Sequence, residues 1–133
     1  MNDEGYHVRS IPSADDPTVL VAHHQPDTKY TGGLADSMYG GLLASLVDCH
    51  SAGTASYMKA REMGLSEESD APRFVTASLT VNFKAPTPAG STLELRAWAE
   101  SIEGRKVWVN CEVIADGVVT VTGHTLMIMV NDD

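Results

Sequence analysis

The chain has 133 residues, of which 43% are hydrophobic and 20% are charged, and this composition is typical of a single globular domain that can bury a core. Its formal net charge of −9 argues against binding to a phosphate backbone, so we expect no nucleic-acid partner. No apolar run reaches the roughly 18 residues of a membrane span, and the acidic start of the chain differs from a signal peptide. We therefore expect a cytoplasmic protein with no membrane partner.

Cysteines and histidines show no pattern of a metal or disulfide site. Cys49 and Cys111 lack CxxC spacing, and we interpret both as reduced and buried. The five histidines do not form HExxH or another ligand spacing with the cysteines. We expect no metal site.

The first part of the chain predicts a loose segment, then a strand, then a loop. Residues 1–17 are polar and acidic with two prolines, so we expect a flexible N-terminal segment, followed by one domain over residues 18–133. The β-rich run 18–23 predicts the first strand. Residues 25–37 are mostly Pro, Asp, Thr, Gly and Lys, which is the composition of a loop.

One long segment reads as a helix, from about Gly40 to Met63, with Gly64 placed as its C-terminal glycine. Its apolar stripe consists of Leu42, Leu43, Leu46, Val47 and Cys49. Small residues surround the carboxylate of Asp48 on a second face, namely Ala44, Ser51, Ala52 and Ala55. Asp48 is either a structural carboxylate that fixes a turn or a subunit contact, or a functional group.

After residue 73 the apolar period changes to two. In the segment 74–83 an apolar set alternates with a polar set, which predicts a half-buried strand with Thr76 on its polar face. The apolar set is Val75, Ala77, Leu79, Val81 and Phe83. Further strands are expected over 91–102, 106–114 and 118–130, as an antiparallel meander.

The order of one strand, one long helix and four strands has no βαβ alternation. The simplest architecture is an α+β domain in which one antiparallel sheet wraps around one central helix. A helix this apolar also needs cover on its far side, which favours a dimer.

Two motifs then resemble those of the hotdog-fold thioesterases, specifically the small acyl-CoA thioesterases of the phenylacetate-pathway (PaaI) type, which are related to the 4-hydroxybenzoyl-CoA thioesterases. Tyr39-Gly40-Gly41 followed at the family's spacing by Asp48 is similar to their His-Gly-Gly and helical carboxylate. The strand from Val75 to Pro86 is similar to their hydroxyl-bearing strand. The resemblance covers roughly residues 18 to 130 and implies the hotdog fold.

The resemblance also implies roles for individual residues. Asp48 would be the general base or the nucleophile, the Gly40 and Gly41 amides would stabilise the oxyanion, and Thr76 would hold the attacking water. The substrate would be an acyl-CoA with a small or medium, possibly aromatic, acyl group, and coenzyme A would enter only as part of it. In the family the site lies between subunits, so we expect a homodimer or a dimer-of-dimers tetramer.

The sequence departs from the family pattern at two positions, and other candidate substrate contacts lie nearby. Tyr39 stands where the family usually has His, and Gly33 where many relatives have Asn. Tyr39, His50 and Lys84 are candidate substrate-binding residues. His50 lies about 200° from Asp48 around the helix, which favours a hydrogen-bonded interior histidine.

These departures leave a second function open, a non-catalytic protein that binds acyl-CoA or another acyl ligand on the same fold. A hydratase of this fold is less favoured, because Asp48 and His50 are too close in sequence for its Asp and His set.

Overall fold

A computed structural model describes residues 10–16, 18–25, 40–65, 71–88 and 90–130. Its elements are β1 (Ile11–Pro12), β2 (Val19–His24), α1 (Gly40–Glu62), β3 (Phe74–Phe83), β4 (Leu93–Glu103), β5 (Lys106–Ala115) and β6 (Val118–Met129). Gly33 and Tyr39, where the sequence departs from the family pattern, lie outside the described residues, as do 1–9 and 17 of the N-terminal segment.

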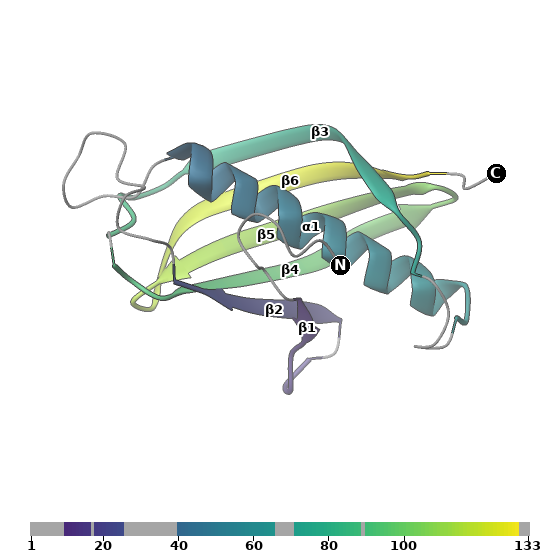
Figure 1. Cartoon of the computed structure of the whole chain (residues 1–133), viewed down its shortest axis with the longest axis horizontal. Coiled ribbons are helices and arrows are strands. Elements are labelled where there is room, and N and C mark those ends of the chain that lie inside the picture. Colours follow the sequence, from purple (N-terminus) through teal and green to yellow (C-terminus); the bar gives the residue numbers. More distant parts are fainter. Residues whose placement is uncertain (1–9, 17, 26–39, 66–70, 89, 131–133) are drawn as a thin grey trace.

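All six strands form one sheet in the order β1-β2-β4-β5-β6-β3, and every neighbouring pair is antiparallel. The helix α1 crosses one face of this sheet (Figure 1). The predicted meander of β4, β5 and β6 is confirmed, and so is the prediction of one sheet around one long helix. The short strand β1, which pairs with β2, was not predicted.

The apolar stripe of α1 packs on the inner face of the sheet. Leu42, Leu43, Leu46 and Val47 are all buried. From the sheet the core receives Leu93, Leu95, Ala97, Val107, Val109, Cys111, Val113, Val121 and Met127. The helix ends as predicted, because Gly64 takes a φ of 70° and the amides of Gly64 and Leu65 bond back to the carbonyls of Arg61 and Ala60.

Helix and sheet approach each other closely at Gly123 in β6. A Cβ atom added to Gly123 would lie 2.4 Å from Cγ1 of Val47, so only glycine leaves room for this side chain. This contact sets how closely the middle of α1 packs on the sheet. It therefore also fixes the position of Asp48, the residue after Val47.

Strand β3 contains a bulge that turns part of it over. Thr76 lies opposite Met127 and Leu79 lies opposite Thr125, and both β6 residues are buried against the helix side. Opposite residues of an antiparallel pair share a face, so Thr76 and Leu79 both face inward although they are three residues apart. The extra residue is Ala77. The prediction that Thr76 lies on the polar face of the strand, opposite to the face of Leu79, is therefore wrong.

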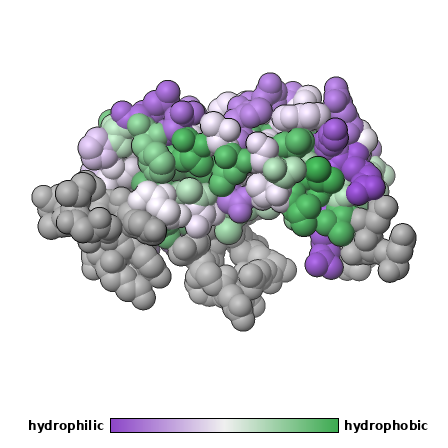
Figure 2. Space-filling view, turned by 90° about the horizontal axis from the view of Figure 1, so that it is seen from above, coloured by the Kyte–Doolittle hydropathy of each residue, from purple (hydrophilic) through white to green (hydrophobic). Residues whose placement is uncertain are grey.

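The edge position of β3 also changes which of its side chains are buried. Val75, Leu79 and Phe83 are 53%, 39% and 56% exposed, so the predicted half-buried apolar face is wrong for these residues. Leu79 and Phe83 are exposed because β3 is the last strand of the sheet and, among the described residues, has a strand neighbour, β6, on one side only. Val75 precedes the inward-facing Thr76 and lies opposite Ile128, so it faces away from the helix. Figure 2 looks onto this edge from above and shows hydrophobic side chains gathered along it.

Candidate functional site

The helix and the edge strand bring Asp48 and Thr76 together. The Thr76 hydroxyl donates a hydrogen bond of 2.5 Å to Oδ1 of Asp48. The hydroxyl oxygen of Thr76 also lies 3.5 Å from Sδ of Met127, which is fully buried. A threonine hydroxyl has one proton, so its oxygen still has a lone pair to accept a hydrogen bond from a water molecule.

Two local features create this pair. The bulge at Ala77 turns Thr76 toward the helix, and bulges often re-aim a side chain in this way. The close approach of Val47 to Gly123 keeps the neighbouring Asp48 near strand β3, within reach of Thr76. Sequence periodicity does not predict the bulge, because a strict alternation of inward and outward side chains assumes a strand with no extra residue.

Gly40 and Gly41 form the first residues of α1, where backbone N–H groups lack helical partners and favour negative charge. They lie eight and seven residues before Asp48, which corresponds to roughly 11 to 12 Å along a helix. One copy of the chain therefore does not bring these amides next to its own Asp48 and Thr76 side chains. Gly40 instead neighbours Phe83, whose ring lies 3.3 Å from the Cβ position of Gly40.

His50 is a fully buried residue of the interior. Its Nε2 lies 2.9 Å from the carbonyl oxygen of Leu20 and its Nδ1 lies 2.6 Å from Oγ of Ser10. A carbonyl can only accept, so Nε2 carries the proton and Nδ1 accepts from the serine. Burial lowers the pKa of His50 to about 4, against the opposing effect of the Leu20 hydrogen bond. This histidine ties the N-terminal segment and β2 to the helix.

The two cysteines differ from the prediction in one respect. Both are free, and Cys111 is buried in the core, where burial raises its pKa to about 12. Cys49 is exposed, so its predicted burial is wrong. Position 49 lies on the side of α1 that faces away from the sheet, although desolvation and the neighbouring Asp48 raise the pKa of its thiol.

Lys84 is exposed just beyond the end of β3, and its backbone amide bonds to the carbonyl of Thr120. It lies beside Phe83 and therefore near the start of α1. Tyr39, the residue before the helix, lies outside the described residues. Met127 was missed by the sequence analysis, because only the register of β3 on β6 shows that it lies opposite Thr76.

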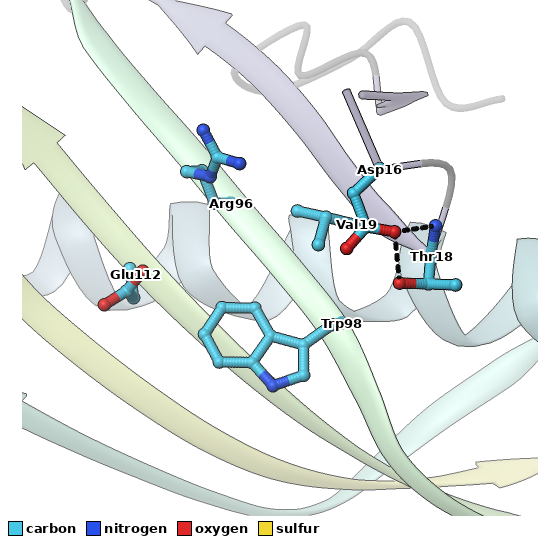
Figure 3. Close-up of a pocket in the computed structure, with 6 residues that line it drawn as sticks. All are labelled: Asp16, Thr18, Val19, Arg96, Trp98 and Glu112. Carbon is cyan, nitrogen blue, oxygen red and sulfur yellow. Dashed lines mark hydrogen bonds between the residues drawn. The ribbon is translucent and has the colours of Figure 1, made fainter. Parts of the chain in front are cut away.

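A separate open pocket of about 400 Å³ lies on the outer face of the sheet (Figure 3). It is lined by Asp16, Thr18, Val19, Arg96, Trp98 and Glu112. Asp16 accepts two hydrogen bonds from Thr18, and these lower the pKa of its carboxyl. The sheet separates this pocket from Asp48 and Thr76.

Within the described ranges, no group of three or more His, Cys, Asp or Glu side chains could hold a metal ion. No helix in the described part of the chain has both the length and the apolarity needed to cross a membrane.

Comparisons with known proteins show which family the chain matches. Residues 36–122 match the family described as the thioesterase superfamily. An acyl-coenzyme A thioesterase from Xenopus laevis, THEM4, is 31% identical over 94 residues, which are 71% of this chain and 36% of that protein. The chain thus spans about a third of the length of this relative.

Solved structures of other proteins have the same fold as this chain. A thioesterase superfamily protein from Shewanella loihica has 32% identity and a TM-score of 0.77, with 97% of this chain and 96% of that chain covered. The PaaI protein of the E. coli phenylacetic acid degradation operon has 17% identity and a TM-score of 0.75, with 95% and 81% covered. The predicted hotdog fold is confirmed.

Proposed function

Because the chain belongs to the thioesterase superfamily, we propose that it hydrolyses the thioester of an acyl-CoA with a small or medium, possibly aromatic, acyl group. The observation that carries the proposal is the hydrogen bond from Thr76 to Asp48. It joins a carboxylate to a hydroxyl that still has a free lone pair, on the helix and strand where the family resemblance predicts them. The name of the Xenopus relative supports the choice of an acyl-CoA.

In the general-base route, a water molecule donates one hydrogen bond to Thr76 and gives its other proton to Asp48 as its oxygen attacks the thioester carbon. The tetrahedral intermediate then collapses, the C–S bond breaks, and the proton held by Asp48 passes to the departing sulfur. In the nucleophile route Asp48 attacks the carbonyl carbon itself, the C–S bond breaks, and coenzyme A leaves as a thiolate that takes a proton from water. A water molecule then hydrolyses the mixed anhydride, which releases the carboxylic acid and restores the Asp48 carboxylate. Both routes use the same two side chains.

The oxyanion needs hydrogen-bond donors, and within one copy the Gly40 and Gly41 amides lie about two turns of α1 away from Asp48. We propose that the Gly40 and Gly41 amides of a second copy supply them, at a helix N-terminus that favours negative charge. Within the described residues β3 has one edge without a strand neighbour, and its Val75, Leu79 and Phe83 are exposed. These features support the homodimer, because an unpaired apolar edge favours pairing with another strand.

The test measures free thiol release from a panel of acyl-CoAs with the wild type and Asp48→Asn. We expect the substitution to lower kcat at least about a hundredfold, which is the scale of general acid–base catalysis. Asp116→Asn is a matched control, because it removes a carboxylate at a turn where φ is 51°, a conformation that Asn tolerates. Equal and slow hydrolysis by wild type and Asp48→Asn would reject the assignment.

The second candidate is a non-catalytic acyl-CoA binding protein, and it is favoured by Tyr39 and Gly33 at the family's His and Asn positions. It predicts saturable binding of acyl-CoA without turnover. Turnover that depends on Asp48 would exclude it.

A further inference from the structure

Phe83 is a large apolar side chain left open at the edge of the sheet. It ends β3, is 56% exposed, and lies opposite the buried Val121, so it faces the helix side of the sheet. Its ring lies 3.3 Å from the Cβ position of Gly40, at the N-terminus of α1. Phe83 therefore flanks the helix amides that we propose as oxyanion donors.

We propose that Phe83 of one copy forms a wall of the acyl site of the second copy and favours acyl groups with apolar bulk. This inference rests on the proposed thioesterase function and on the homodimer described above. It assigns selectivity to a residue that lies far along β3 from Thr76 of its own chain.

The symmetry of an antiparallel strand pair brings the two ends together. The proposal places the two-fold axis of a β3–β3 pair at Thr80, so that Leu79 of one strand lies opposite Val81 of the other. All of these inward-facing side chains then stay on the helix side of the sheet. Past the extra residue Ala77, the next inward-facing pair is Thr76 with Phe83 of the partner.

The Phe83 ring would act on the proposed site in two ways. It covers the start of a helix whose amides would bind the oxyanion, and exclusion of water strengthens such hydrogen bonds. It also presents apolar surface beside the reacting carbonyl, where a longer acyl chain buries more area than an acetyl group. Selectivity for the longer chain should therefore depend on Phe83.

The first test compares kcat/KM for hexanoyl-CoA and acetyl-CoA in the wild type, Phe83→Ala and Phe83→Leu. We expect the wild type to prefer hexanoyl-CoA, Phe83→Ala to lower that preference about tenfold or more, and Phe83→Leu to keep most of it, since one methylene is worth about tenfold or more in an apolar pocket. No preference in the wild type, or an equal loss on both substrates in Phe83→Ala, would overturn the inference.

The second test asks whether Phe83 acts across the subunit boundary. Heterodimers of Asp48→Asn and Phe83→Ala chains, purified through two different tags, contain one site with Asp48 from one copy and Phe83 from the other. Their other site lacks both groups. We expect the heterodimer to recover the wild-type preference, whereas a preference that stays at the Phe83→Ala value would show that Phe83 acts on its own chain.

The outcomes separate this inference from the proposed function. A wild type that hydrolyses no acyl-CoA refutes the function, while turnover that depends on Asp48 with an unchanged preference in Phe83→Ala refutes only the role of Phe83. Light scattering checks that Phe83→Ala remains dimeric. If it does not, Phe83→Val, which keeps strand propensity, takes its place in both tests with the same expected direction.

Discussion

The Thr76 hydroxyl and the Asp48 carboxylate meet across 2.5 Å because a bulge in an edge strand turns the threonine toward a helix. Since Thr76 gives its only proton to Asp48, it can bind the attacking water only as an acceptor. In the proposed mechanism the hydroxyl would thus have two tasks, which are to orient the carboxylate and to hold the water in line with it.

We predict that Thr76→Val lowers kcat about tenfold to a hundredfold and leaves KM almost unchanged. Hydrogen bonds to charged groups contribute about 1.5 to 3 kcal/mol, which corresponds to this range in rate. Thr76→Ser keeps the hydroxyl and should remain within a few-fold of the wild type. Steady-state kinetics on one acyl-CoA measure both, and a fully active Thr76→Val would exclude both tasks.

We predict that Leu79→Lys abolishes both dimer formation and turnover while the fold is kept. Leu79 is 39% exposed and faces inward in the open edge strand, and an inward-pointing lysine blocks edge-to-edge pairing. Light scattering gives the oligomeric state and circular dichroism the fold. Val118→Lys replaces another exposed apolar residue, away from this edge, and should leave the oligomeric state as it is. An active monomeric Leu79→Lys would refute the interfacial site.

The sequence predicted those parts of the fold that depend on local signals. The helix end follows from Gly64, whose positive φ suits glycine, and the last hairpin follows from Asp116 and Gly117, which both take a positive φ. The alternation of β4, β5 and β6 is undisturbed over most of their length, so their pairing could be read directly.

The rest of the fold and of the site depends on contacts between distant residues. No local pattern marks Ala77 as an extra residue, since the bulge exists only relative to the register of β6. The same holds for Ser10, whose hydroxyl reaches His50 forty residues later. The family resemblance identified Asp48 and Thr76 as partners, whereas periodicity placed Thr76 on the wrong face.

We predict that Gly123→Ala destabilises the protein by about 1 to 3 kcal/mol, which is the usual cost of overpacking a core. The added Cβ would lie 2.4 Å from Cγ1 of Val47. Val47→Ala removes that methyl group, so the double variant should be more stable than the sum of the single effects predicts. Urea unfolding of the four proteins measures this coupling, and strictly additive effects would contradict the contact.

We predict that His50 makes the stability of the protein depend on pH between about 4 and 6.5. Burial lowers its pKa from 6.5 to about 4, so in this window the unfolded chain binds a proton that the folded protein does not. Its contribution is therefore present above pH 6.5 and is lost as the pH falls toward 4. The loss is on the order of 3 kcal/mol, from 1.36 kcal/mol for each pKa unit.

His50→Gln tests this dependence, because the amide can still donate to the Leu20 carbonyl and accept from Ser10, but it does not titrate. Urea unfolding at pH 7 and pH 5 should give a smaller difference in the free energy of unfolding for His50→Gln than for the wild type. An identical difference in the two proteins would mean that His50 is not the group that titrates, and that the acid sensitivity of the fold arises at carboxylates instead.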